Sequence, residues 1–152
     1  MDRMTLQGSW FVNVPKGNVY EIMSDFEAMP KNFPGVADSL KIINKEGNNL
    51  VIHGVAKAFG RKFDVEMHTE LLPGKGFRSK NNSPIVKDGL EEFLLEDEGS
   101  GTRINYSYEI TVKNKFLRLI AKPLFGGFSM WRWKKLVIDK LESIANSNTS
   151  NN

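Results

Sequence analysis

The sequence predicts an α+β fold in which an antiparallel β-sheet packs against one long C-terminal helix. Three observations support this prediction. Turn-forming residues recur about every ten residues through the middle of the chain, β-forming residues alternate with polar residues between the turns, and apolar residues near the C-terminus follow helical spacing. Turns this close together leave no room for crossover helices, so each strand is expected to pair with the next one.

The chain is expected to begin with one strand and two short helices. Residues 8–14, GSWFVNV, are rich in β-forming side chains and predict the strand. Val19–Met23 predicts a short helix, and Ser24-Asp25 offers a cap for a second one. The prolines at positions 30 and 34 then stop helical continuation.

Strands and turns alternate from there to Lys113, and a helix closes the domain. Residues 115–145 have the apolar spacing of a helix, whereas residues 146–152, NSNTSNN, are polar and are expected to be disordered. A chain of 152 residues fits one domain, which we place over residues 1–145. The turn signals are Glu46-Gly47-Asn48-Asn49, Gly60-Arg61, Pro73-Gly74, Asn81-Asn82-Ser83-Pro84 and Gly99-Ser100-Gly101.

The composition is that of an ordinary globular protein, with 40% hydrophobic and 26% charged residues. Cysteine is missing from the sequence, which excludes disulfides and thiolate chemistry. The opening MDRMTLQGSW has no apolar run of the kind found in signal peptides, and no stretch approaches the roughly 20 apolar residues that span a bilayer. We expect a cytoplasmic protein, either free or peripheral to a membrane.

Alternation along the strands assigns one face of the sheet to the interior. Over residues 63–71, Phe, Val, Met, Thr and Leu alternate with Asp, Glu and His. If an even-length turn at Gly60-Arg61 joins this strand to the one before it, then Gly54, Ala56 and Ala58 share its inner face. Three successive inner positions would then carry almost no side chain. The space above them must be filled from elsewhere, or it stays open as a cavity.

Helical spacing gives the C-terminal helix one apolar stripe about 80° wide, which is expected to cover the sheet. Other aromatic and apolar residues fall off this stripe. Either the helix breaks or reorients at Pro123 or Gly126-Gly127, or it exposes aromatic side chains on a second side. The stripe consists of Met130, Trp133, Val137, Leu141 and Ile144, with Phe116 and Leu119 extending it, and the residues off it are Leu124, Phe125, Phe128 and Trp131.

The order of these elements, and three segments in particular, resemble the START-like superfamily with its helix-grip fold. The segments are FVNVPKGNVYEIMSDFEAMPKNFPGV (residues 11–36), EDEGSGTRINYSYEI (residues 96–110) and the closing helix. In this superfamily an aromatic residue such as Tyr20, an Asp such as Asp25 and a Phe-Pro-Gly such as Phe33-Pro34-Gly35 recur in this order. The polyketide cyclase-like, coenzyme Q-binding and carbon monoxide dehydrogenase-associated branches look most similar.

The resemblance implies a curved sheet of about seven strands wrapped around the long helix, with a cavity between them for an apolar ligand. A solid core built from the same residues is the alternative. Methionines adapt to irregular apolar shapes, and tyrosines supply a polar handle within such a pocket. The candidate lining consists of Met29, Phe33, Ile52, Gly54, Ala56, Phe63, Val65, Met67, Phe93, Tyr106, Tyr108, Met130, Trp133 and Val137.

Two charged residues are further candidates for anchoring the polar end of a ligand. Glu91 points inward beside Tyr108 if the turn at Gly99-Ser100 has two residues, and Arg78 reaches the interior if the turn at Pro73-Gly74 does. An odd-length loop would turn either side chain outward. The sequence contains no nucleophile motif, P-loop or dinucleotide-binding glycine motif, so we predict no catalytic residue and no cofactor.

A basic aromatic patch lies on the C-terminal helix, where Trp131 is close to Arg132, Lys134 and Lys135. Tryptophan beside lysine is typical of surfaces that meet a membrane interface, and it also suits a protein partner. The alternative is that this side of the helix packs on the two short helices. The basic residues do not surround an aromatic sheet surface, so no nucleic-acid partner is expected.

The two histidines, His53 and His68, are expected on the outer face of the sheet. With a two-residue turn at Gly60-Arg61 they would lie directly opposite each other, near Glu66 and Glu70. Two imidazoles and a carboxylate are ligands that zinc accepts. We interpret the group as a solvated polar pair and predict no metal site.

These inferences give three hypotheses for function. The first is noncatalytic binding or transport of a hydrophobic small molecule, a lipid or an isoprenoid quinone, in the cavity. The second is a small cyclase- or dehydratase-type enzyme that uses the same cavity. The third is a co-chaperone-like interaction module. The quinone and membrane associations rest on the resemblance alone.

Overall fold

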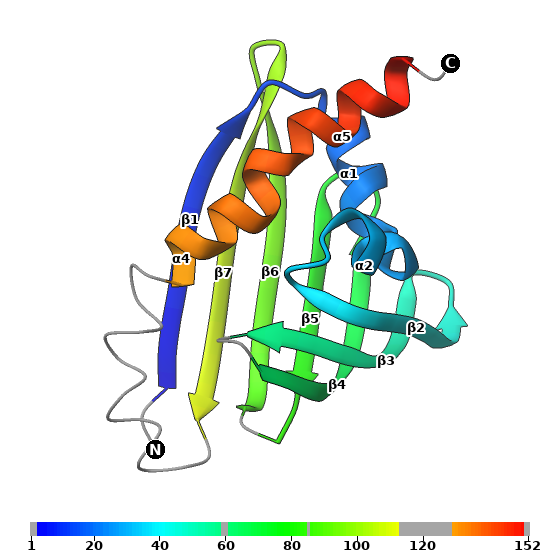
Figure 1. Cartoon of the computed structure of the whole chain (residues 1–152), viewed down its shortest axis with the longest axis vertical. Helices are drawn as coiled ribbons and strands as arrows, with labels where there is room; N and C mark the ends of the chain where they lie inside the picture. Colours follow the sequence, from blue (N-terminus) through cyan, green and yellow to red (C-terminus); the bar gives the residue numbers. More distant parts are fainter. Residues whose placement is uncertain (1–2, 59–60, 85, 113–128, 151–152) are drawn as a thin grey trace.

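In the computed structural model, the chain folds into one curved antiparallel sheet with helices packed on one face (Figure 1). The structure describes residues 3–58, 61–84, 86–112 and 129–150. Within these residues seven strands lie in the order β1-β7-β6-β5-β4-β3-β2, which confirms the predicted α+β helix-grip fold. The strands are β1 (Arg3–Val12), β2 (Ala37–Glu46), β3 (Asn49–Ala58), β4 (Arg61–Leu72), β5 (Gly76–Asn82), β6 (Val86–Glu98) and β7 (Gly101–Val112).

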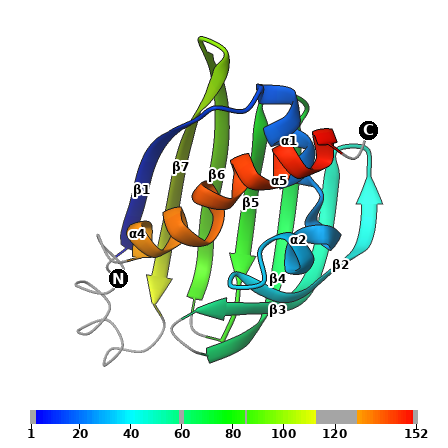
Figure 2. The same ribbon diagram turned by 45° about the horizontal axis from the view of Figure 1, so that its top comes forward.

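The helices follow β1 and β7. Three short ones lie between β1 and β2, and the C-terminal helix crosses the sheet diagonally (Figure 2). Its middle turn is π-helical, a wider turn that often occurs at functional sites. The helical elements are α1 (Lys16–Ser24), the 3₁₀-helix η1 (Phe26–Ala28), α2 (Met29–Asn32), α4 (Ser129–Trp133), the π-helix η3 (Lys134–Ile138) and α5 (Asp139–Ser150).

Two element ends differ from the sequence prediction. β1 begins at Arg3 instead of Gly8, because it pairs with β7 along its whole length. α5 continues beyond Ala145 to Ser150, into the polar segment for which disorder was expected. The predicted start of the C-terminal helix, and the break or reorientation near its glycines, fall in residues 113–128 and lie outside the described residues.

Hairpin loop lengths decide which side chains face the interior. Ala58 pairs with Arg61, so the β3–β4 connection has even length and the predicted shared face of these strands is confirmed. The β6–β7 connection is likewise even, because Glu98 pairs with Gly101. The β4–β5 loop instead holds three residues, 73–75, and therefore reverses the face predicted for β5.

Gly54 faces the interior, but close packing explains it better than open space does. A Cβ atom at Gly54 would lie 2.1 Å from the carbonyl oxygen of Ser39. β2 bulges between Ala37 and Ser39, which brings its backbone against β3. The room that the sequence suggested above Gly54 is therefore occupied by β2, and the open space lies further along, beside Ala56.

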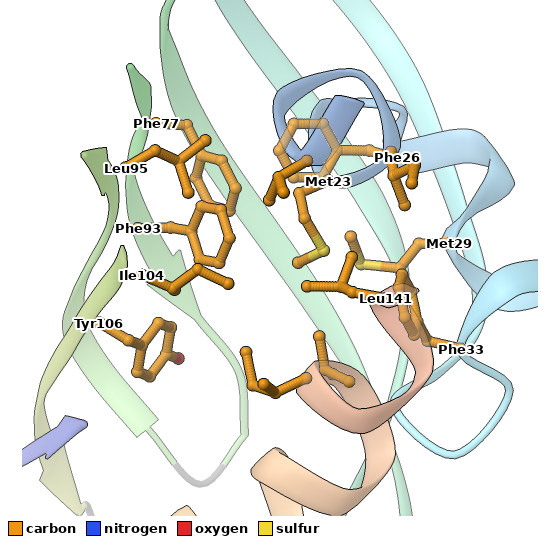
Figure 3. Close-up of a cluster of buried hydrophobic side chains, with 14 of the residues drawn as sticks. Met23, Phe26, Met29, Phe33, Phe77, Phe93, Leu95, Ile104, Tyr106 and Leu141 are labelled. Carbon is orange, nitrogen blue, oxygen red and sulfur yellow. The ribbon is translucent and has the colours of Figure 1, made fainter. Parts of the chain in front are cut away.

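One hydrophobic core joins the sheet to the helices (Figure 3). The ring of Phe77 stacks on Phe93 at 5.2 Å between centroids, and Phe26 meets Phe77 edge-on at 5.1 Å. Methionines from the short helices point toward these rings (Figure 3). Phe33 and Ile52, which were predicted to line a cavity, are fully buried in this core. The solid core and the cavity therefore divide the interior between them.

Candidate functional site

A cavity of about 280 Å³ lies between the sheet and the C-terminal helix. Its wall is mainly apolar and draws on the short helices, the loop before β2, several strands and the C-terminal helix. Many of the predicted lining residues meet in it. These are Met29, Ala56, Val65, Met67, Glu91, Tyr106, Tyr108, Trp133 and Val137.

Other predicted lining residues do not form this wall. Phe33, Ile52 and Phe93 belong to the solid core, and Gly54 is covered by β2. Phe63 is partly buried and lies outside the cavity wall as far as the described residues define it. The side chain of Met130 lies outside the described part of the chain.

Arg78 faces away from the cavity, contrary to the sequence prediction. The three-residue loop before β5 places Arg78 opposite Glu70, and it places Ser79 on the inner face opposite Thr69. The Arg78 Nε atom donates a hydrogen bond to Glu92 Oε2 at 3.1 Å on the outer surface. Arg78 is therefore excluded as an interior anchor.

A polar network crosses the sheet at the floor of the cavity. The Tyr106 hydroxyl donates to Glu91 Oε2 at 2.5 Å. Ser79 Oγ donates to Asn81 Oδ1 at 2.8 Å, and Thr69 lies 2.8 Å from the Ser79 hydroxyl. Among the described residues, every buried side-chain nitrogen and oxygen has a partner. The network is therefore complete without a ligand, and its edge, at Asn81, Glu91 and the tyrosines, meets the cavity.

Asn81 is part of the site that sequence reasoning missed. It lies on β5, whose inner face was assigned wrongly because of the loop at residues 73–75. Its side chain hydrogen-bonds to Glu91 and to Tyr108 as well as to Ser79. A correct loop length would have placed this amide beside Met67 on the inner face.

Stacked aromatic rings hold Tyr106 in place. The indole of Trp133 stacks on the Tyr106 ring, with 4.4 Å between centroids and 23° between planes. The ring centroids of Trp10 and Trp133 lie 5.1 Å apart. Gly8 makes room for Trp10, because a Cβ atom there would lie 2.1 Å from the indole. The stack leaves the Tyr106 hydroxyl directed into the interior (Figure 3).

Burial shifts the acid–base behaviour of this network toward neutral forms. Burial raises the pKa of Glu91 above its ordinary 4.5, while hydrogen bonds from Tyr106 and Asn81 oppose the rise. Burial also raises the pKa of Tyr108 to about 12 and that of Tyr106 well above 10.0. The phenols therefore stay protonated, and Glu91 has an increased tendency to act as a neutral carboxylic acid.

The loop of residues 33–37 meets the C-terminal helix at the partly exposed side of the cavity. A Cβ atom at Gly35 would lie 2.6 Å from Leu136 Cδ2, so glycine permits this contact. The Lys57 ammonium holds the same loop by donating to the Pro34 carbonyl at 3.0 Å. Gly35, Lys57 and Leu136 all line the cavity, so this loop forms part of its rim.

The predicted basic patch divides between the surface and the cavity. Trp131 is 54% exposed, and the Lys135 ammonium lies 4.5 Å from the centre of its ring. Lys134 pairs with Asp139 at 2.9 Å on the surface. Arg132, however, lines the cavity. Sequence reasoning assigned it to the surface because it lies between Trp131 and the lysines of the basic aromatic patch.

The two histidines lie on the outer face but not directly opposite each other. His53 pairs with Glu66, because the β3–β4 loop begins one residue earlier than predicted. Glu66 Oε1 lies 3.5 Å from His53 Nε2 and 3.0 Å from His68 Nε2. Within the described ranges, no group of three or more His, Cys, Asp or Glu side chains could hold a metal ion.

None of the helices in the described residues is both long enough and apolar enough to cross a bilayer.

The sequence matches the family described as polyketide cyclase / dehydrase and lipid transport over residues 12–129. The match covers most of the chain, from the end of β1 into α4. The chain therefore belongs to this family, and the START-like resemblance is confirmed. Among curated proteins, none matches the sequence significantly.

Solved structures share the fold at low sequence identity. The protein TTHA0849 from Thermus thermophilus superposes with a TM-score of 0.77 at 19% identity, over 95% of this chain and 99% of that one. A START superfamily protein from Mycobacterium smegmatis superposes with a TM-score of 0.74 at 14% identity, over 92% of this chain and 98% of that one. The Zhui aromatase/cyclase from Streptomyces sp. R1128 superposes with a TM-score of 0.67 at 14% identity, over 97% of this chain and 90% of that one. Identities this low show the fold alone.

The pKa of Glu91 predicts how Glu91→Gln changes stability with pH. Above pH 4.5 the unfolded chain releases the Glu91 proton more readily than the folded chain, so the wild type loses folding stability as pH rises toward the folded-state pKa. Glutamine carries no such proton. Urea unfolding should therefore show Glu91→Gln gaining stability relative to wild type as the pH rises above 4.5.

Glu92→Gln is the matched control, because Glu92 pairs with Arg78 on the outer face. It should gain no stability relative to wild type over the same pH range. A stability difference between Glu91→Gln and wild type that stays constant with pH would contradict burial as the dominant influence on this carboxyl.

Proposed function

We propose that this protein binds and carries a hydrophobic small molecule, a lipid or an isoprenoid quinone, without catalysing a reaction on it. The observation that carries the proposal is the cavity of about 280 Å³, lined mainly by apolar side chains of the sheet and the helices. Burying an apolar ligand there removes its surface from water, at roughly 25 cal/mol per Å². The family description, which includes lipid transport, supports the same class of ligand.

The cavity size limits which part of a ligand can be enclosed. Pockets for drug-sized molecules occupy roughly 300–1,000 Å³, and this one lies near the lower end at about 280 Å³. A quinone ring or a short acyl segment suits that volume. A long isoprenoid or acyl tail would extend past the rim at Gly35 and Leu136.

The exposed patch of Trp131, Lys134 and Lys135 supports a role beside a membrane. Trp131 is adjacent in sequence to Arg132, which lines the cavity, so the patch and the cavity share helix α4. A tryptophan ring and ammonium groups suit an interface with anionic headgroups. Docking through this patch would place the cavity close to the lipid from which a ligand enters.

Glu91 favours a second candidate function, a cyclase- or dehydratase-type enzyme. Burial raises the pKa of Glu91, so this carboxyl keeps its proton more readily than an exposed one and can donate it to a ligand oxygen, which the neighbouring Tyr108 can hold by a hydrogen bond. The solved aromatase/cyclase with this fold makes that chemistry relevant.

Native mass spectrometry of freshly purified protein, followed by organic extraction, separates the two functions. The carrier is expected to retain a prenylated or acylated molecule. Empty protein that converts an aromatic polyketide-like substrate, and loses this turnover in Glu91→Gln, would instead establish the enzyme.

Filling the cavity should abolish ligand binding while the fold survives. Ala56→Trp places a large ring where the cavity wall now has a methyl group. We expect loss of the retained ligand in native mass spectrometry, with the free energy of unfolding reduced by no more than about 3 kcal/mol. Thr5→Trp adds the same ring on the exposed outer face of β1 and should retain the ligand. Full retention in Ala56→Trp would refute the placement of the site.

Removing the patch should weaken membrane binding in a salt-dependent way. The double change Trp131→Ser with Lys135→Glu removes an exposed ring and reverses a charge. We expect roughly tenfold weaker binding to vesicles rich in anionic lipid at low salt, and a smaller difference at high salt, because salt screens the headgroup attraction. Vesicle co-sedimentation measures the binding at low salt and at high salt.

A matched control exists on β1 and β7. Phe11 is 46% exposed, and the Arg103 guanidinium lies 6.0 Å from the centre of its ring. Phe11→Ser with Arg103→Glu makes the same kind of change on another surface and should leave vesicle binding unaltered. If both double variants weaken binding equally, net charge would explain the effect and the patch would not.

A further inference from the structure

Among the described residues, two cations, Lys57 and Arg132, line the cavity, and their surroundings differ. Lys57 is already occupied, since its ammonium donates to the Pro34 carbonyl at 3.0 Å and lies 3.3 Å from Asp38 Oδ1. Arg132 makes no ion pair with any carboxylate in the described part of the chain. Among the lining residues that the structure describes, Arg132 therefore carries the positive charge that has no acidic partner.

Glu91, the acidic residue among the described lining residues, does not pair with Arg132. Glu91 accepts a hydrogen bond from Tyr106 at 2.5 Å, and it lies beyond salt-bridge distance from Arg132. Apolar residues make up most of the remaining wall. A charge beside an apolar surface is stabilised most by an opposite charge that hydrogen-bonds to it, and an enclosed ligand can supply that charge.

Arg132 is placed near the rim of the cavity. It lies one turn before Leu136 on the C-terminal helix, and Leu136 contacts Gly35 of the rim loop. Arg132, Leu136 and Gly35 are all partly exposed. The cavity thus has Arg132 at its partly exposed side, an apolar middle, and a floor with hydrogen-bonding groups at Glu91 and Tyr108.

We propose that the ligand is an amphipathic organic anion, whose apolar body fills the cavity and whose carboxylate or similar oxoanion binds Arg132 at the rim. This inference rests on the proposed carrier function and narrows its ligand class. A planar guanidinium binds an oxoanion through two parallel hydrogen bonds, which a neutral quinone or sterol cannot match. Neutral oxygen atoms on the same ligand would lie at the floor, where Glu91 and Tyr108 meet them.

The test uses two fluorescent probes that share one aromatic body. Anilinonaphthalene sulfonate carries an anionic group, and phenylnaphthylamine lacks it. The wild type should bind the anionic probe about tenfold more tightly than the neutral one, as expected for a hydrogen bond between charged groups. Arg132→Gln should lose about tenfold in affinity for the anionic probe and keep its affinity for the neutral probe.

Two further variants separate local recognition from general charge. Lys135→Gln removes one positive charge from the same helix, but from the exposed side over Trp131, and should change neither affinity. Arg132→Lys keeps the charge without the planar fork and should recover part of the anion preference. Thermal unfolding of each variant tests whether it folds. If a variant does not fold, the affinities of the wild type for the two probes still test the inference.

The possible results separate the anion inference from the carrier function. Equal wild-type affinity for both probes would overturn the anion inference while the carrier function stands. An equal loss of affinity for the anionic probe in Arg132→Gln and Lys135→Gln would also overturn the anion inference. If neither probe binds the wild type, or if both bind Ala56→Trp as tightly as wild type, the proposed cavity function fails instead.

Discussion

The stack of Trp133 on Tyr106 is the contact on which the site depends. It joins the C-terminal helix to the middle of β7 through two large rings 4.4 Å apart, and Trp10 supports it from β1. Both rings also form part of the cavity wall. The contact that attaches the helix to the sheet therefore also shapes part of the cavity.

The same contact organises the electrostatics of the interior. Tyr106 is fixed by Trp133 and directs its hydroxyl to Glu91, while Asn81 hydrogen-bonds to the same carboxyl. The network spans strands that are far apart in the sequence, and it satisfies its own polar groups among the described residues. An apolar cavity whose floor groups already hydrogen-bond to one another discriminates by shape, and Arg132 at its rim would add discrimination by charge.

Sequence reasoning found the fold and much of the cavity wall, but with uneven success. The inward positions of Glu91, Tyr106 and Tyr108 followed from alternation and a two-residue turn, which the structure contains. The face of β5 was wrong because Pro73-Gly74 predicts a turn without specifying its length, and one extra residue reverses every side chain after it. Asn81 was missed and Arg78 was misplaced for this single reason.

Local periodicity in the sequence determined which segments are strands or helices and which face of most of them is apolar, because both patterns depend on residues a few positions apart. Only the tertiary structure decided what those faces meet. Gly54 is explained by the Ser39 carbonyl from another strand, and Gly35 by Leu136 from the C-terminal helix. Arg132 lines the cavity although Trp131 before it is exposed. Such contacts join segments distant in the chain, and no short-range pattern encodes their distance or direction.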